Sequence, residues 1–507
     1  MAAEQRVKMG DSAPAQSGGA WLPSRLRRHW PLCILLGIGG LVRLLTMVAY
    51  PPALLYPDSW GYIATAYAGP FVSVATEHPS GYPALIRLLT LPDRSLLELV
   101  MFQHVAGLGV GVGVYAALTR ARVPRWGATA AAALVLLDGY MITLEQYVMS
   151  DTFFDATMLA AALVLAWPRL APRRSSSDPS AERVGAPGGA TWARALICGL
   201  LLAGASLERE TAPFAIPVFL IYLAWVRAGW RALVAFVLAV TIPLLAYSAA
   251  VDAQFGVFGL TATSGWTLYG RVAGFADCQG VKLEAAARPL CETGAERASH
   301  PTTPDWYIWG PSPARLLFKP ATEPVSSIAR TNATLNSFAD AIIRHQPLAY
   351  AEASLSAFGR DFIPGSLAQA HALDATSLPV NAGQEATSAA TRNRDLPGLH
   401  PTVRAPSGLI RSYRSIVHLP RPVLAVLALA AVLGVLIRVP SRREVFLLAG
   451  AGLILLLGTA ATGGPGMRYL LPSVPLIAIG GSIALAQLAP RFRPRLRAIR
   501  RPSGRGA

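Results

Sequence analysis

Two aspartates and two arginines lie beside apolar segments of the sequence, where a charged side chain calls for a structural or chemical explanation. Asp58 follows an apolar segment, in the run Tyr-Pro-Asp-Ser-Trp-Gly-Tyr, and Asp151 precedes another. Arg209 lies between two glutamates, and Arg468 opens the last apolar segment, in Met-Arg-Tyr-Leu-Leu-Pro. A carboxylate can take a proton from a hydroxyl group, and the planar guanidinium group suits a phosphate. Together they would suit a reaction in which a hydroxyl group attacks and a phosphate departs.

These residues also have simpler interpretations. Asp58 and Asp151 could be helix N-caps, since an aspartate accepts hydrogen bonds from the first backbone N–H groups of a helix. The arginines could form ion pairs with nearby acids. Asp155 is harder to explain, because it lies one turn into an apolar run, where a charge costs about 2.5–3.5 kcal/mol. We therefore expect Asp155 to face a cavity, a water pocket or a cation.

Two further polar residues raise the same question. Arg43 lies toward the end of the first apolar segment, where snorkelling of the guanidinium group to the interface is the simpler interpretation. His78 follows Glu77 in a Glu-His-Pro-Ser-Gly-Tyr-Pro run and could bind a metal, although a lone histidine near a membrane is more often an ordinary polar residue. We assign no metal ligand and leave a requirement for a divalent cation open.

The composition predicts the environment of these residues. Of 507 residues, 53% are hydrophobic and only 14% are charged, whereas a soluble domain carries about 25% charged residues. The net charge of +17 would indicate a nucleic-acid partner in a soluble protein. Here the low charge content predicts an all-α polytopic membrane protein with about ten transmembrane helices, each of about 20 mostly apolar residues.

Ten segments are apolar enough to be candidate spans, and some of them are short. Four closely spaced glycines in the second segment, at 107, 109, 111 and 113, indicate close helix packing. The segments are residues 31–50, 96–119, 126–144, 148–170, 193–207, 211–226, 232–250, 423–438, 445–461 and 469–488.

Basic residues predict the orientation. Arginine clusters recur at every second connection, as cytoplasmic loops do under the positive-inside rule. They lie at residues 25–28, 120–125, 169–174, 227–231, 438–443 and 491–505. This pattern accounts for most of the charge without nucleic acid. It predicts a multi-pass protein of the plasma (inner) membrane with both termini in the cytoplasm and the Asp/Arg residues on the opposite side.

The connections complete the predicted organisation. Residues 326–358 have the spacing of a helix along the membrane surface, and the Ser/Pro/Gly-rich residues 175–189 predict a disordered loop. Cys278 and Cys291 could form a disulfide in an oxidising compartment. The predicted parts are a basic N-terminus (1–30), a transmembrane module of about seven helices (31–250) with a catalytic outer loop (51–95), an extracytoplasmic loop region (251–421), further transmembrane helices (422–488) and a basic tail (489–507).

The order of these motifs resembles the membrane glycosyltransferases of the C superfamily, in particular the branch of protein mannosyltransferases and aminoarabinose transferases. Asp58 in Asp-Ser-Trp-Gly-Tyr, followed by His-Pro-Ser-Gly-Tyr-Pro, matches the acidic residue after the first helix. Asp151 matches the second acidic position, although glutamate is common there. Arg468 matches the closing Arg-Tyr-x-x-Pro signature, and Arg209 is placed like the phosphate-side arginine. The loop region shows no motif that assigns a branch.

The resemblance implies transfer of a sugar from a polyprenyl-phosphate donor to a hydroxyl group of an extracytoplasmic glycan, protein or lipid in the cell envelope, with inversion. Asp58 would be the general base and Asp151 a second catalytic acid. The residues expected to bind the substrate or the lipid phosphate are Arg209, Arg468, Tyr469, Tyr62, His78 and Glu77.

Two other functions compete with this one. A lipid or solute transporter or flippase would also carry buried charges, but it would place them near the midplane and contain internal repeats, and we find no convincing repeat. A non-catalytic assembly partner would act through its long loop. The sequence carries no Walker motif and no Gly-x-Gly-x-x-Gly run between a strand and a helix, so we expect no nucleotide-binding domain.

Overall fold

The computed structural model describes residues 29–69, 73–91, 93–171, 188–320, 323–364, 394–396, 399–464 and 466–499. This part of the chain is helical, and its strand-like pairing is an isolated bridge between Leu54 and Tyr147. Seven helices are long and apolar enough to cross a membrane, or up to nine if two bent helix pairs each form one span. The predicted segment 211–226 forms a shorter apolar helix, Ala212–Trp225, so the described residues do not confirm the expected count of about ten spans.

The spanning helices occupy the predicted segments. The single spans lie in α2 (Trp30–Ala49), α5 (Leu96–Arg120), α8 (Asp151–Leu170), α9 (Gly188–Glu208), α11 (Trp230–Phe255), α21 (Arg442–Thr462) and the run of α22 (Met467–Leu470), η5 (Leu471–Ser473) and α23 (Val474–Ile499). The bent pairs are α6 (Arg125–Leu136) with α7 (Gly139–Gln146), and α19 (Ser407–Ile416) with α20 (Arg421–Leu436). The short apolar helix combines η1 (Ala212–Ala215) and α10 (Ile216–Trp225).

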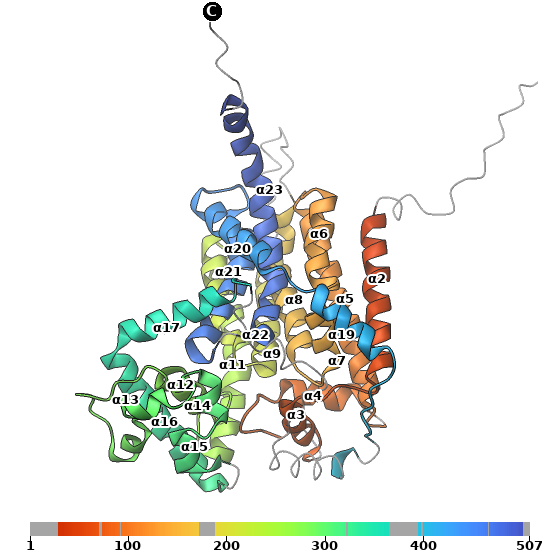
Figure 1. Ribbon diagram of the computed structural model, residues 1–507. Coiled ribbons are helices and arrows are strands. Elements are labelled where there is room, and N and C mark those ends of the chain that lie inside the picture. The colour runs from red at the N-terminus through yellow and green to blue at the C-terminus, as the bar shows by residue number, and fades with distance from the viewer. Residues whose placement is uncertain are drawn as a thin grey trace, which may run out of the picture.

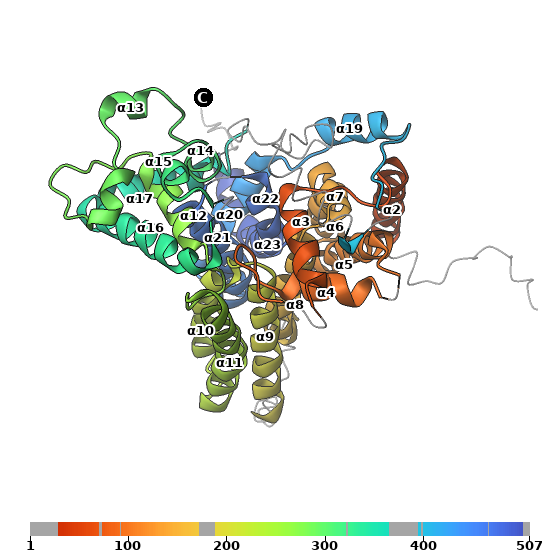
Figure 2. The ribbon, with the colours of Figure 1, turned by 90° about the horizontal axis from the view of Figure 1, so that it is seen from below.

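The bundle has two unlike ends (Figure 1). We call the end where α23 reaches Ile499 the tail end. There, His29, Arg120, Arg122 and Arg125 line one cavity with Trp167. These are residues of the predicted cytoplasmic side. We call the opposite end, where α3 (Pro57–Tyr67), α4 (Gly81–Leu89) and the helices between α12 and α16 lie, the site end (Figures 1 and 2).

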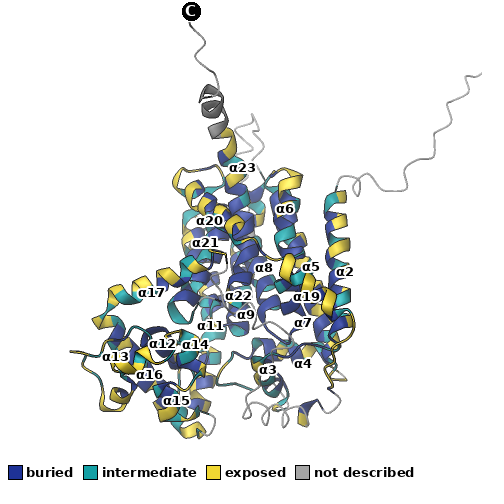
Figure 3. Cartoon of the chain, viewed as in Figure 1, coloured by how far each residue is buried: buried dark blue, intermediate teal, exposed yellow. Residues whose placement is uncertain are grey.

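Apolar side chains cover the outside of the spanning helices. Ile38 and Leu41 of α2, Val105 of α5 and Ile242 of α11 are 46–65% exposed. Figure 3 shows the exposed residues along one side of α2. Because burial of apolar surface is the main driving force of folding, these faces need a lipid environment.

Close helix packing at the predicted glycines holds for three of the four. A Cβ atom at Gly107 would overlap the carboxylate of Glu145, one at Gly111 would overlap Leu136, and one at Gly113 would lie 3.1 Å from Leu159. Nothing lies within 4 Å of the corresponding position at Gly109.

The two long connections contain more helix than expected. The first holds α3 and α4. The second holds α12 (Ser264–Ala273), η2 (Ala285–Leu290), α13 (Gly294–Ala298), α14 (Pro304–Trp309), α15 (Pro313–Phe318), α16 (Val325–His345) and α17 (Pro347–Arg360). We call the part from α12 to α16 the outer module. It has its own apolar core, including Tyr269, Tyr307 and Phe338, and a disulfide between Cys278 and Cys291.

The single helix expected over 326–358 is two helices, α16 and α17. Pro347 begins α17, and Gln346 before it has left the helical region, with φ −126° and ψ 55°. Proline disfavours the helical conformation of the preceding residue, which explains the break. The predicted loop 175–189 lies almost wholly outside the described residues, as do the basic stretches 1–28 and 500–507.

Candidate functional site

Four charged side chains from distant parts of the sequence form one row at the site end. Arg209 Nη1 donates a hydrogen bond to Asp151 Oδ1, and Arg468 Nε donates to Asp151 Oδ2 over 3.3 Å. Arg468 Nη1 also donates to Asp58 Oδ2. We call Arg209, Asp151, Arg468 and Asp58 the charged row. Charges alternate along it, so each inner residue faces two opposite charges.

Backbone contacts place the two aspartates beside each other. The segment before α3 runs along the segment before α8, with Leu54 N bonded to Gln146 O at 2.9 Å and Val148 N bonded to Leu54 O at 3.0 Å. Ser59 Oγ accepts from Tyr56 N at 2.8 Å and donates to Val148 O at 2.9 Å. The start of α3 is therefore fixed to the approach to α8.

Neither aspartate is an N-cap. The N-cap of α3 is Tyr56, with Asp58 in the first turn, and the N-cap of α8 is Ser150. Neither carboxylate caps a helix, and both accept hydrogen bonds from arginines. The two arginines also lie at helix ends. Arg209 directly follows α9, and Arg468 lies in the short helix α22.

Aromatic rings support the guanidinium groups. The Cζ atom of Arg468 lies 5.5 Å from the ring centre of Tyr56. That of Arg209 lies 5.7 Å from the ring of Phe154 and 5.4 Å from the ring of Tyr469. Such cation–π contacts contribute about 0.5–2 kcal/mol each, and they orient the planar groups toward the carboxylates.

His78 and Tyr62 lie beside the Asp58 end of the row. His78 Nε2 is 3.9 Å from Asp58 Oδ2, and its ring stacks on that of Tyr62 at 4.6 Å between centres. Tyr62 is buried, and its hydroxyl group lies 3.3 Å from Ser150 Oγ. The stacked Tyr62 ring therefore helps to fix the position of the His78 ring. Glu77 is exposed and interacts electrostatically with Arg315 of α15, so it lies outside the row.

The pKa values follow from this arrangement. Burial by itself would raise the pKa of Asp58, but electrostatic interaction with Arg468 and, after it, with His78 outweighs burial, so the pKa is lowered. Asp58 is therefore an anion at neutral pH. Burial raises the pKa of Tyr62 to about 12, so this phenol stays neutral.

Asp155 faces a cavity, as expected. A small cavity at the start of α8 is lined by Asp151 and Asp155, by Glu145 of α7 and by residues of α5. Asp155 thus shares this cavity with Asp151, an inner residue of the charged row.

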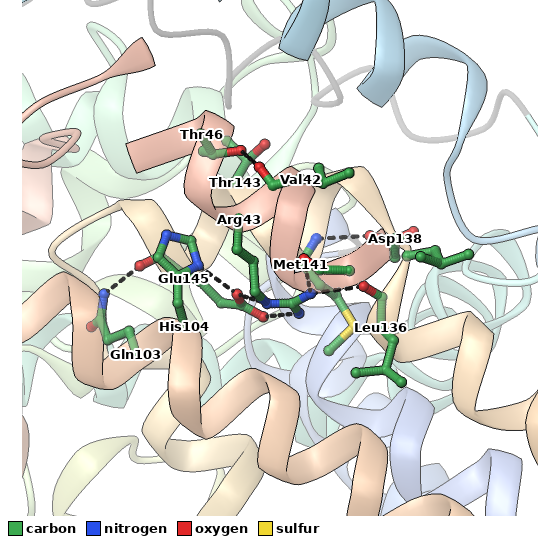
Figure 4. A network of polar contacts seen from close by, with 12 residues as sticks. Val42, Arg43, Thr46, Gln103, His104, Leu136, Asp138, Met141, Thr143 and Glu145 are labelled. Atoms are coloured by element: carbon green, nitrogen blue, oxygen red, sulfur yellow. Dashed lines mark hydrogen bonds and ion pairs between the residues drawn. The ribbon is translucent and has the colours of Figure 1, made fainter. Parts of the chain in front are cut away.

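Arg43 does not snorkel, because its guanidinium group is held inside the bundle (Figure 4). Nε and Nη2 donate to the two carboxylate oxygens of Glu145 at 2.7 and 2.6 Å, and Nη1 donates to Leu136 O at 2.8 Å. His104 Nδ1 lies 2.7 Å from Glu145 Oε2. We call Arg43, Glu145 and His104 the intramembrane network. Arg43 is therefore not a candidate phosphate ligand.

Sequence reasoning missed some residues near the row. Tyr56 and Phe154 were not singled out, since an aromatic residue in an apolar region carries no distinguishing signal. Asp305 of α14 interacts electrostatically with Tyr56, whose pKa is raised mainly by burial. Pro304 packs near Gly464, just before Arg468. The outer module therefore borders the row, which no motif in its sequence indicates.

The described residues do not fit a divalent cation as they are arranged. They contain no group of three or more His, Cys, Asp or Glu side chains placed to hold a metal ion. Oxygen atoms of Asp58 and Asp151 accept from arginines instead. We therefore derive no step through a metal.

Comparison with known proteins gives little further information. No family model and no curated protein matches the chain. Its fold is similar to that of an archaeal oligosaccharyltransferase from Archaeoglobus fulgidus, in complex with an inhibitory peptide and a dolichol-phosphate, with 14% identity and a TM-score of 0.37 over 96% of this chain and 53% of the other. A second structure of that enzyme, with zinc and sulfate, gives 15% identity and a TM-score of 0.36 over 91% and 50%. The chain spans about half the length of these structures.

Proposed function

We propose that this protein is an integral membrane glycosyltransferase that transfers a sugar from a polyprenyl-phosphate donor to an acceptor hydroxyl group. The observation that carries the proposal is the double contact of Arg468, which joins Asp58 to Asp151 and Arg209 at the end of the helix bundle. The row brings an ionised base and two cations together where α8, α9 and α22 begin or end.

Each residue of the charged row has a separate role in the proposed reaction. Asp58 takes the proton of the acceptor hydroxyl group, and the oxygen forms a bond to the anomeric carbon while the bond from that carbon to the phosphate oxygen breaks. The leaving phosphate receives the electron pair and is stabilised by Arg468 and Arg209. Attack from the side opposite the phosphate inverts the anomeric configuration. Asp151 positions both arginines.

Donor binding would also activate the base. In the row, Arg468 lowers the pKa of Asp58 and so weakens it as a base. A donor phosphate competes with Asp58 for the guanidinium group and brings negative charge nearby, and both effects raise the pKa of Asp58. Asp58 would become more basic only when the donor is bound. Tyr469, Tyr56 and His78 would line the phosphate and acceptor sides.

The proposed location is the plasma (inner) membrane, with the termini in the cytoplasm and the site end on the other side. The basic tail end supports this orientation through the positive-inside rule. The Cys278–Cys291 disulfide supports an oxidising environment for the outer module. Non-reducing peptide mapping of protein from membranes tests this placement, which is wrong if both thiols are free.

The position of the row favours this function over transport. A transporter site is expected near the bilayer midplane, whereas Arg209, Asp151 and Arg468 lie where α9, α8 and α22 end or begin.

An assay with purified protein tests the proposal. Wild type and Asp58→Asn are supplied with polyprenyl-phosphate sugars and with glycan, peptide or lipid acceptors. Loss of the base should slow transfer by about 10²–10⁴-fold. Asp340→Asn is the matched control, since Asp340 is an exposed aspartate in an i,i+4 pair with Arg344. Equal rates for Asp58→Asn and wild type would contradict the role of Asp58.

Donor binding is measured separately. Arg209→Ala and Arg468→Ala should each weaken binding of the polyprenyl-phosphate sugar, because each removes a cation from the proposed phosphate site. Unchanged affinity in both variants would remove the phosphate role.

A further inference from the structure

Asp155 is a buried acid that the proposed reaction does not use. It lies on α8, one turn beyond Asp151, and its side chain is 6% exposed. Its Oδ1 atom is buried and has no hydrogen-bond partner. An unpartnered polar atom in such a position is costly, so this carboxyl group needs an explanation.

The cations near Asp155 are already engaged. Four charged groups interact electrostatically with it: Asp151, Arg209, Glu145 and Glu208. Arg209 donates to Asp151. Glu145 is held by Arg43 and His104. Three of the four neighbours are acids, and the fourth already has a carboxylate partner. An ionised Asp155 would therefore meet mostly like charge, which disfavours ionisation.

The cavity beside Asp155 has room for a hydrogen-bond acceptor of a protonated carboxyl group. Its polar wall is formed by Asp155, Asp151, Glu145 and Thr152. Its remaining wall is Gly107, Val110, Met141 and Leu144, which bring no charge from α5 or from the body of α7. The space holds about one water molecule. Such a water could accept from a neutral carboxylic acid and donate to the two carboxylates.

We propose that Asp155 is a protonated, neutral carboxylic acid at neutral pH, and that its O–H group donates a hydrogen bond to a single water shared with Asp151 and Glu145. In this state Asp155 is a positioning residue. Because neutral Asp155 carries no charge, it does not compete with Asp151 for Arg209. The shared water connects the charged row to the intramembrane network. An ionised Asp155 would compete with Asp151 for Arg209 and would weaken the row.

Infrared spectroscopy tests the protonation state without relying on the proposed transferase activity. A protonated carboxylic acid has a carbonyl stretching band separate from that of a carboxylate. The difference spectrum of wild type and Asp155→Asn, in lipid at neutral pH, should contain one acid band that shifts in heavy water. Asp340→Asn, which removes an exposed carboxylate, should lose carboxylate intensity only. Loss of carboxylate intensity in Asp155→Asn would overturn the proposal.

The positioning role is tested by transfer assays. Asparagine resembles a neutral carboxylic acid and can still donate a hydrogen bond, so Asp155→Asn should keep activity within about threefold of wild type. Asp155→Leu keeps the branching of the side chain but has no donor, and it should lose about tenfold or more. Equal losses in both variants would show that the charge of Asp155 is needed. If wild type itself transfers no sugar, the proposed function fails while the infrared result still stands or falls alone.

Discussion

The charged row and the intramembrane network are built from the same residue types and have opposite characters. In the network, the Arg43 and Glu145 side chains are 2% and 3% exposed, and every donor of Arg43 described here meets an oxygen of Glu145, Leu136 or Gly39. In the row, Asp58 and Arg468 are both 16% exposed. The network is closed to solvent, whereas the row is partly exposed at its Asp58–Arg468 end.

Under the proposed function, this difference separates a structural from a chemical use of charge. A buried ion pair is tolerated only with good geometry and full hydrogen bonding, which the bidentate contact of Arg43 with Glu145 provides. Such a pair has no room for a ligand. In the row, Arg468 is shared between two carboxylates and Asp58 is partly exposed, so a phosphate can replace Asp58 at Arg468 while Arg468 keeps its contact with Asp151.

The largest effect is expected on stability when the network is broken. Glu145→Ala removes the partner of both Arg43 and His104 and should cost about 3–5 kcal/mol of unfolding free energy. Thermal unfolding in detergent measures this loss, with Glu352→Ala, at an exposed position of α17, as control. Unchanged stability together with lost transfer would place Glu145 in the reaction and end the distinction.

In the row, Arg468→Gln should act on transfer instead. It removes the guanidinium group that joins Asp58 to Asp151, and it should lower kcat/KM by about 10²-fold. Arg468→Lys keeps the charge without the fork and should lie between this variant and wild type. If Arg468→Gln lowered the unfolding temperature as much as Glu145→Ala, the row would be as structural as the network.

A smaller effect is expected at the helix contact under the network. A Cβ atom at Gly107 would overlap the Glu145 carboxylate, so Gly107→Ala should cost about 1–3 kcal/mol of unfolding free energy by overpacking. Gly109→Ala is the matched control on the same helix, because nothing lies within 4 Å of its added methyl group. Equal stability of the two variants would mean that Glu145 can move without cost.

The most subtle test is the pH dependence of transfer. Because the pKa of Asp58 is lowered in the free protein, kcat/KM should persist as the pH falls through the usual range of an aspartate. In the donor complex the phosphate draws Arg468 away and raises the pKa of Asp58. The acid limb of kcat should therefore lie at higher pH than the acid limb of kcat/KM. Coinciding limbs would show that the donor does not compete for Arg468.

Local sequence was enough to predict several features. Apolar length located the spanning helices, because this signal depends on composition within a short window. The orientation that the arginine clusters indicate stays a prediction. The types and order of Asp58, Asp151, Arg209 and Arg468 were sufficient to single them out. The insertion cost of a charge was sufficient to predict that Asp155 faces a cavity.

Only the tertiary structure decided which charges meet. Arg43 and Glu145 are 102 residues apart, and Asp58 and Arg468 are 410 apart. No local pattern indicates that Arg43 is closed into a pair while Arg468 stays shared between two acids. These partners are set by how helices pack, through contacts such as Gly107 against Glu145 and the pairing of Leu54 with Tyr147. Packing depends on residues distant in the chain, so it determines which charge is structural and which can react.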